Sequence, residues 1–369
     1  MNAIHTTLAR TALACAIHLA ACTGAETAPE SPTVPVSPPA AGEHHDALSE
    51  WHLFTDVSHQ TPAEGVTPYE VVAPLFTDYA AKSRFLYVPP GSAITYDDAG
   101  PWQFPVGSVL VKTFAYPRDP DQPDGELRLV ETRLLYLTDE GWQADTYVYD
   151  DDQRDAHRKV AGEFVELDAA LPSGRTTLDY HVPNAEECKH CHAHDDVVAP
   201  LGVRTRQLDR AHDYGEGPED QLEHLAALGL LDREPQPRAA EGRLVDPFEP
   251  SVDLALRARS YLDSNCAHCH SSGGFAAPSG MFLDLGSTAP GVPQSTWGVC
   301  KTPPASPSNC GASFDVVPGD ADASILLCRM RSTDIAAHMP PLGTTVVHEE
   351  AAGLVASWID SMPAQACNP

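Results

Sequence analysis

Two short segments of this chain share one pattern of metal-binding side chains. Each has a cysteine, two variable residues, a second cysteine and a histidine: Cys188-Lys-His-Cys191-His192 and Cys266-Ala-His-Cys269-His270. Thiols and an imidazole at this spacing could hold a zinc ion, form a dithiol redox pair or attach a haem covalently. The three chemistries imply different proteins, so the rest of the sequence must decide between them.

The histidine directly after the second cysteine, present in both copies, favours covalent haem. In that chemistry two thiols add across the two vinyl groups of one porphyrin, and the next histidine binds the iron. A structural zinc site needs four ligands that close around one ion, and a redox dithiol does not need the histidine. The sequence therefore predicts two haem c groups, with thioether bonds to Cys188, Cys191, Cys266 and Cys269 and iron bonds to His192 and His270.

The N-terminal segment indicates export. Arg10 precedes an apolar run, residues 11–21, that is too short to span a bilayer and is typical of a secretory signal. It ends in Leu-Ala-Ala-Cys22, the arrangement at which bacterial lipoprotein signals are cleaved before a lipidated cysteine. An ordinary signal peptide with a coincidental cysteine is the alternative. Residues 22–48, rich in Ala, Pro, Ser, Thr and Glu, are predicted to be a disordered tether.

The charge of the chain narrows its partners. It has 52 acidic and 23 basic residues and a formal net charge of −29 at pH 7. Such a surface disfavours nucleic acid and anionic lipid and attracts basic proteins. We expect a periplasmic, outer-membrane or cell-surface lipoprotein that meets redox proteins with basic docking surfaces. Its contact with the membrane would be the lipid anchor only.

The C-terminal half contains a candidate second iron ligand. Residues 252–265 and 348–361 have helical patterns, and between them stands Met339-Pro-Pro-Leu-Gly343. A haem bound by histidine on one side takes a second axial ligand, and a thioether on a proline-stiffened loop can supply it. Met339 is therefore predicted to bind the second iron, with a core side chain as the alternative. Histidine–methionine ligation raises the reduction potential, as in electron carriers.

The N-terminal half has strand patterns instead. Runs of β-branched and aromatic residues at 84–88, 108–116, 127–137 and 142–149 are bounded by Pro-Gly, Asp-Gly and Glu-Gly turns. They predict an antiparallel β domain. Residues 218–228, closed by Gly229, are predicted to form a helix that connects the two halves.

Residues 252–361 resemble a class I cytochrome c domain of a bacterial subgroup. The resemblance rests on the second motif, the run 316–326, Met339-Pro-Pro-Leu-Gly and the final Trp-Ile helix. It implies an all-α domain. A Pro- and Ser-rich loop, residues 287–313, departs from that pattern and contains Cys300 and Cys310, which we expect to pair. Cys328 and Cys367 would then clamp the terminal helix, although four cysteines allow three connectivities.

Most of residues 49–361 also resembles a bacterial family of di-haem c-type cytochromes of unassigned role. The matching segments are Tyr69, 74–84, 104–114, 131–133, the first motif, 200–202 and the cytochrome half. The chain departs from that family at Asp209 and Asp220, where asparagine is expected, so a role for those amides does not carry over.

A further resemblance concerns the first motif. The order Phe104-Pro-Val-Gly-Ser-Val-Leu-Val-Lys112, then Gly141-Trp142, then a late motif is similar to that of small β-sheet c-type cytochromes, including the c-prime-beta group. It implies a five-coordinate first haem, bound by His192 with an open distal face and with Lys112 near the haem edge. The alternative for Lys112 is a strand lysine that faces solvent.

Other side chains around the first motif leave alternatives open. A bis-histidine first haem would take its second ligand from His157, His181, His194, His212 or His224. Glu131 and Arg133 are interpreted as a charged pair of the strands or as a contact to a haem propionate. His190 and His268 occupy the variable positions of the motifs and are expected to face outward.

Together these patterns predict an α+β multidomain protein. A signal peptide (1–21) and a tether (22–48) precede an antiparallel β domain that carries the first haem motif (49–244) and an all-α class I cytochrome c domain (245–369). The predicted function is electron transfer in the periplasm or at a membrane surface. The alternative is a haem enzyme, peroxidase-like or acting on nitrogen compounds, or a protein that binds NO, CO, peroxide or hydroxylamine at an open first haem. No catalytic residue is assigned.

Overall fold

The structure is a computed structural model that describes residues 34–195, 197–236, 242–305 and 310–368. The predicted signal peptide and Cys22 lie outside these ranges. Residues from Pro35 onward form one compact unit. Among the residues that the structure describes, no helix has the length and apolar character needed to cross a lipid bilayer.

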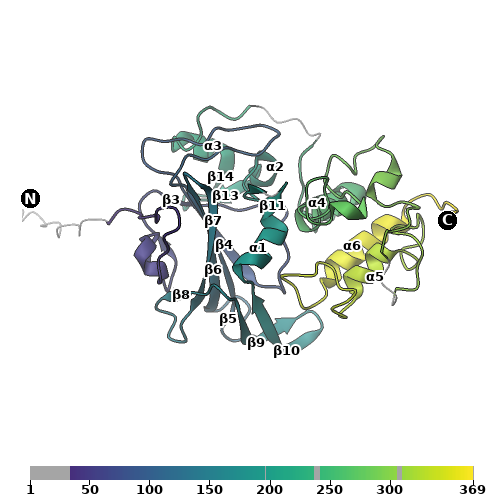
Figure 1. The fold of residues 1–369 in the computed structure, drawn as a ribbon, viewed down its shortest axis with the longest axis horizontal. Coiled ribbons are helices and arrows are strands. Elements are labelled where there is room, and N and C mark those ends of the chain that lie inside the picture. The colour runs from purple at the N-terminus through teal and green to yellow at the C-terminus, as the bar shows by residue number, and fades with distance from the viewer. Residues whose placement is uncertain (1–33, 196, 237–241, 306–309, 369) are drawn as a thin grey trace, which may run out of the picture. The chain divides into compact units, whose positions relative to one another are not determined.

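The largest element is a six-stranded antiparallel sheet in the strand order β3-β4-β5-β6-β7-β8 (Figure 1). Its strands are β3 (Val66–Pro68), β4 (Ala81–Tyr87), β5 (Val109–Pro117), β6 (Leu127–Thr138), β7 (Gly141–Tyr149) and β8 (Ala156–Arg158). The four runs expected as strands correspond to β4, β5, β6 and β7. Each strand pairs with the next in sequence, and the connections range from the tight turn between β6 and β7 to residues 88–108 between β4 and β5.

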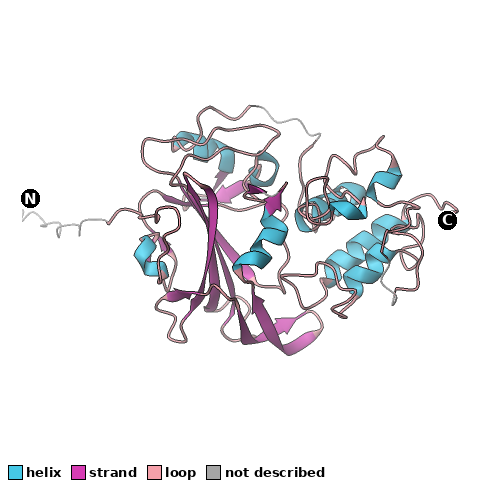
Figure 2. Ribbon diagram, viewed as in Figure 1, coloured by secondary structure: helices cyan, strands magenta, loops and turns pink. Residues whose placement is uncertain are grey.

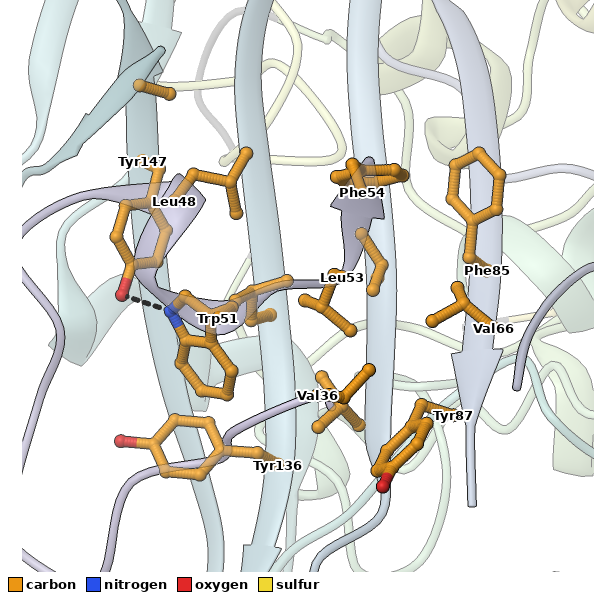
Figure 3. Close-up of a cluster of buried hydrophobic side chains, with 14 of the residues drawn as sticks. Val36, Leu48, Trp51, Leu53, Phe54, Val66, Phe85, Tyr87, Tyr136 and Tyr147 are labelled. Carbon is orange, nitrogen blue, oxygen red and sulfur yellow. Dashed lines mark hydrogen bonds between the residues drawn. The ribbon is translucent and has the colours of Figure 1, made fainter. Parts of the chain in front are cut away.

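Alternation of side chains gives this sheet two different faces. One face packs on the segment of η1 (Leu48–Trp51) and β1 (Phe54–Asp56) in a cluster that includes Phe85, Val111 and Leu134. Trp51 is fully buried there, and its indole Nε1 donates a hydrogen bond of 2.7 Å to the hydroxyl of Tyr147 (Figure 3). The opposite face carries the apolar residues Leu86, Leu110 and Phe114 and, between them, charged side chains.

The described residues that precede position 49 pack on the sheet, within the segment predicted as tether. Val36 is buried in the cluster around Trp51, and the amide of Ser37 donates to the carbonyl of Trp51 at 3.0 Å. Leu48 is also buried there. The described part of the segment predicted as tether, residues 34–48, therefore packs on the sheet, because its few apolar side chains fill gaps in the core.

Smaller elements complete the N-terminal part (Figure 2). They are β2 (Thr61–Pro62), the hairpin β9 (Glu163–Leu171) with β10 (Gly174–Val182), α1 (Ala185–His192), β11 (Ala193–His194), β12 (Val197–Val198), α2 (Thr205–Leu208), β13 (Ala211–Asp213), β14 (Pro218–Asp220) and α3 (Gln221–Ala227). The helix α3 falls within the predicted 218–228. It packs on the sheet through Leu222 and Leu225, which are fully buried, so it belongs to the β part rather than linking two halves.

The C-terminal part contains the helices α4 (Leu254–Asn265), α5 (Ile325–Arg331) and α6 (Glu349–Asp360), with the short 3-10 turns η2 (Ala277–Ser279) and η3 (Gln294–Trp297). The helices α4 and α6 lie within the two stretches with helical patterns. They pack in one apolar cluster, in which Trp297 stacks on Trp358 with ring centres 5.2 Å apart.

The predicted all-α class I cytochrome c domain is wrong. Strands outnumber helices in the structure, with only 19% of residues helical and six α-helices in the described ranges. The three α-helices of the C-terminal part have only 12, 7 and 12 residues. The long connection between α4 and α5 is rich in glycine and proline, which disfavour helix interiors, so most of this part is loop.

The β part and the helical part contact each other directly. The carboxylate of Asp78 accepts hydrogen bonds from the amides of Thr345 and Val346, at 2.8 and 3.1 Å. The ring of Phe76 stacks on His348 at 4.0 Å, and its amide donates to Asn265 at 2.7 Å. These contacts fix the start of α6 and the end of α4 beside the loop that precedes β4.

Candidate functional site

The first motif lies on α1. Asn184 caps this helix by accepting hydrogen bonds from the amides of Glu186 and Glu187, which satisfies two of the donors at the helix start. Residues three apart share one face of a helix, so Cys188 and Cys191 project from the same side. Both thiols are free and half-buried. The motif histidine, His192, is the last residue of the helix.

The imidazole of His192 is held in a defined tautomer. Its Nδ1 lies 3.1 Å from the carbonyl oxygen of Ala199. Because a carbonyl only accepts, Nδ1 carries the proton and Nε2 has the free lone pair. Burial lowers the pKa of His192 to about 4, so the ring is neutral at neutral pH. A neutral imidazole with a free Nε2 is the form that binds a metal.

The second motif begins where α4 ends. The amides of Cys269 and His270 both donate to the carbonyl of Cys266, at 3.1 and 2.8 Å, and so fold the motif into a tight turn. The next turn packs so closely that a Cβ at Gly274 would clash with the carbonyl of Cys269. Glycine is therefore required at that position.

His270 repeats the arrangement of His192. Its Nδ1 lies 3.2 Å from the carbonyl oxygen of Met281, so Nδ1 is again the donor and Nε2 the free ligand atom. Burial lowers the pKa of His270 as well. The two copies of the motif therefore match in the tautomer of their histidines, although one lies at the end of a helix and the other in a loop.

The structure brings the two motifs together. The ligand atoms of Cys191, His268 and Cys269 all lie within 4.8 Å of one another. The thiol of Cys269 is 3.4 Å from the carbonyl oxygen of His190, and the amide of Asp195 donates to the carbonyl of Gly273 at 3.0 Å. Residues almost eighty positions apart thus form one continuous site.

The expectation that His190 and His268 face outward is wrong. His190 packs on Phe275 with ring centres 4.5 Å apart, and His268 faces the thiol of Cys191. Both variable positions of the motifs are therefore used in the contact between the motifs. A pocket of about 310 Å³ opens beside this contact and is lined by residues within or shortly after the motifs, among them Lys189, Asp195 and Phe275.

The contact also changes the acidity of the thiols. A hydrogen bond between the two thiols lowers the pKa of Cys191 to about 4 and raises that of Cys269. Burial raises the pKa of the other two, Cys188 and Cys266, the latter to about 12. Cys191 and Cys269 therefore share one proton at neutral pH. The thiols of Cys188 and Cys266 each stay protonated.

Met339 is placed apart from the apolar core. Met281 and Met330 are buried in the cluster of α4 and α6, and Met362 packs against it. Met339 is half-buried, and its amide donates to the carbonyl of Arg329 at 3.1 Å. Its side chain is therefore not used as core filler, and its bond to iron stays a prediction.

The four other cysteines of the described ranges form two disulfides, as expected, but with another connectivity. Cys300 pairs with Cys367, and Cys310 pairs with Cys328. The predicted pairs, Cys300 with Cys310 and Cys328 with Cys367, are wrong. The backbone explains the difference, because Val299 bridges to Val316 and Phe314 bridges to Ser324. The loop that carries Cys310 is thereby laid beside the start of α5, leaving Cys300 to the C-terminal tail.

The histidines considered for a bis-histidine first haem all have other partners. His157, His194 and His224 lie within 3.4 Å of carboxylate oxygens of Asp150, Asp195 and Glu219. His181 stacks on Phe164 and lies near Glu187, and His212 packs edge-on against Tyr214. None of these contacts brings the ring to the first motif as an axial ligand.

Lys112 is not the solvent-facing strand lysine of the alternative interpretation. It lies on the charged face of the sheet with its Nζ 4.8 Å from the centre of the Phe114 ring. Its charge is one of the groups that lower the pKa of His192, after burial, so the two side chains are within electrostatic range. Arg133 pairs with Glu131 on the same strand. Its charge acts to lower the pKa of Cys188, against the larger effect of burial, so these two side chains are also within electrostatic range.

Comparisons of this chain with protein-family models, with curated proteins and with solved structures found no match. The function must therefore be argued from the site itself.

Proposed function

We propose that this protein is an exported di-haem c-type cytochrome that transfers electrons. The observation that carries the proposal is the matched chemistry of the two motifs. Each offers two free thiols and a neutral imidazole whose Nδ1–H is bound by a backbone carbonyl. That is the donor set a haem c requires, since the thiols form thioethers and Nε2 binds the iron.

The protein's own residues would position these groups in defined ways. The capped helix α1 holds Cys188 and Cys191 on one face, and the turn after α4 holds Cys266 and Cys269. The carbonyls of Ala199 and Met281 fix the ring orientations of the two histidines. A bound haem supplies one-electron chemistry, and Met339 is proposed as the second axial ligand at the second site.

The contact between the motifs supports electron relay within the chain. Cys191 and Cys269, which would anchor different haems, lie within 4.8 Å of each other through their sulfur atoms. Two haems anchored there would be adjacent. The acidic chain, with a net charge of −29, supports docking of basic redox partners, and Cys22 supports attachment by a lipid anchor.

A second candidate is a zinc site between the motifs, favoured by the cluster of Cys191, His268 and Cys269. Two thiols and an imidazole are zinc ligands, and a fourth ligand would be needed to close a structural site. This candidate excludes the first one at these atoms, because a thioether sulfur of a haem c is no longer available as a thiolate.

One experiment separates the two candidates. The full chain is produced in a bacterium that attaches haem c, and its reduced visible spectrum and zinc content are measured on the same sample. We expect two c-type haems per chain and no stoichiometric zinc. One zinc per chain without haem bands would replace the cytochrome proposal. Carbon monoxide is then added to the reduced protein. A Soret shift on half of the haem would support an open first iron and hence ligand binding or catalysis.

A further inference from the structure

A row of positive side chains crosses the sheet beneath the first motif. Arg84 on β4, Lys112 on β5 and Arg133 on β6 stand directly opposite one another in the strand register. Lys82, two residues before Arg84, points to the same face. Like charges directly opposite each other destabilise a sheet, so this row has an energetic cost unless something compensates it.

The nearby carboxylates do not fully compensate the row. Glu131 is buried and receives two hydrogen bonds from Arg133 and one from the hydroxyl of Tyr180. Arg84 pairs with Glu70 at 3.1 Å. The carboxylate of Asp78 is occupied by the amides of Thr345 and Val346.

The two lysines are left without a carboxylate. Among the described residues, the only hydrogen bond that Lys82 Nζ donates goes to the carbonyl of Ala80, at 2.9 Å. In the described ranges, Lys112 Nζ forms no hydrogen bond or ion pair and contacts the face of the Phe114 ring. Burial lowers the pKa of Lys82 to about 7 and that of Lys112 well below its ordinary value, and Arg84 adds to both effects.

Lysines without an ion pair are unexpected in a chain of this composition. Acidic residues outnumber basic ones by 52 to 23, yet Lys82 and Lys112, both half-buried, form no ion pair with a carboxylate in the described ranges. A buried charge without a partner is costly and is retained where a ligand supplies the opposite charge. The cluster also lies within electrostatic range of His192 and Cys188, the metal-binding and thioether-forming residues of the first motif.

We propose that Lys82, Arg84, Lys112 and Arg133 form an anion-binding site beside the first motif, for carboxylate or small oxyanion groups. The anion is either a propionate of the first haem or a free anion drawn to its iron. The position of the ligand relative to iron rests on the proposed function, whereas the anion site itself rests on the cluster. Lys112 is the central group, because it stands between both arginines and has no partner of its own.

The test uses the full, haem-loaded chain and the substitution Lys112→Gln, with Lys159→Gln as the matched control. Lys159 lies outside the cluster and outside both motifs, and its side chain is 40% exposed and pairs with Glu163 at 2.9 Å. Because Lys112 loses only its contact with the Phe114 ring, its replacement should change the unfolding temperature little. Lys82→Gln provides a second variant of the same cluster.

Binding of nitrite and of neutral imidazole to the oxidised protein is followed by the Soret band. If the site takes a free anion, Lys112→Gln weakens nitrite binding by about tenfold or more, the effect of one charged hydrogen bond. Imidazole binding and the Lys159→Gln control stay within about twofold of the unchanged protein.

If the site takes a haem propionate, nitrite binding is unchanged and the midpoint potential of one haem responds instead. That potential falls in Lys112→Gln and gains a pH dependence between about pH 4 and 7, because the freed propionate regains an ordinary carboxylic pKa. If neither nitrite affinity nor potential differs from the control, the proposal is overturned.

Haem content measured on the same samples separates this failure from failure of the proposed function. Should the chain carry no haem, anion binding is read from the unfolding temperature with and without nitrite. The unchanged protein and Lys159→Gln must then be stabilised and Lys112→Gln must not. Equal stabilisation of all three would overturn the anion site.

Discussion

The two motifs have the same five-residue pattern but are held in different surroundings. The first lies on the eight-residue helix α1, against a sheet face that carries Lys112 and Arg133. The second follows the twelve-residue helix α4, in an apolar cluster that two disulfides cross-link. Positive charge acts on both motif histidines, but Lys112 at the first site forms no ion pair in the described ranges. At the second site Lys301 pairs with Asp315 at 3.2 Å, and the half-buried Met339 belongs to that region.

The different surroundings of the two motifs suggest that one sequence pattern can form two haem sites with different properties. A protein tunes a haem through its axial ligands, its local charge and the burial of the site. We infer that the first site is tuned by positive charge and is suited to an anion, and that the second is tuned by a thioether and is suited to carrying electrons. The predictions below test whether the two sites differ in this way.

The largest expected effect is loss of one haem. Replacing both cysteines of the first motif, Cys188→Ser with Cys191→Ser, removes its thioether bonds and should reduce the haem content from two to one per chain. The same change at Cys266 and Cys269 should leave the other haem. Haem content and reduced spectra measure both results. Loss of both haems from either variant would mean that the two sites are not independent, and would contradict the separate roles inferred for them.

The next largest effect is the loss of stability when a disulfide is removed. Both disulfides of the described residues lie in the region of the second motif. Cys300→Ser with Cys367→Ser opens a loop of 67 residues and should lower the free energy of unfolding by about 4 kcal/mol. Opening the 18-residue loop between Cys310 and Cys328 should cost about 3 kcal/mol. Denaturant unfolding, followed by the near-ultraviolet signal of the stacked Trp297 and Trp358, measures both. An equal cost for the two loops would argue against the chain-entropy explanation.

A smaller effect is expected at the second iron. Met339→Ala removes the proposed thioether ligand and should lower the higher of the two midpoint potentials by on the order of 100 mV. Carbon monoxide should then bind both haems instead of one. Potentiometric titration and the Soret shift measure these changes. Met362→Ala is the control, since Met362 packs against the core. Unchanged potentials in Met339→Ala would remove Met339 from the site.

The smallest effect is a pH dependence from the charged face of the sheet. Burial lowers the pKa of Lys82 from 10.5 to about 7, and the neighbouring Arg84 and Arg133 act in the same direction against Asp78. Between these two values the unfolded chain binds more protons than the folded chain, so the free energy of unfolding rises with pH from about 7 to 10.5. The free energy of unfolding of the Lys82→Met variant should rise less over this pH range. Parallel curves for both proteins would show that Lys82 keeps an ordinary pKa.

Much of the local structure could be predicted from the sequence. The runs that became β4 to β7 and the stretches that became α4 and α6 have periodic patterns over neighbouring residues. The four cysteines that follow the second motif could be recognised as disulfide partners from their number and the expected export. Each of these inferences depends on residues close together in the chain or on composition, where propensity and spacing act directly.

The long-range arrangement could not be predicted in this way. The resemblance to an all-α domain failed because glycine- and proline-rich loops, not helices, fill most of the segment between α4 and α5. The disulfide connectivity followed from the backbone bridges of Val299 and Phe314, which no local pattern shows. The end of the tether was misplaced because two apolar residues, Val36 and Leu48, pack into the core around Trp51.

The sequence by itself determined the chemistry available to this protein: two thiol-and-imidazole motifs, an acidic chain and a sheet of alternating residues. Only the tertiary structure decided that Cys191 meets Cys269 and that Arg84, Lys112 and Arg133 align across three strands. The physical reason is that such contacts depend on strand register and on the packing of segments far apart in the chain. Those are properties of the whole fold, and no short stretch of sequence contains them.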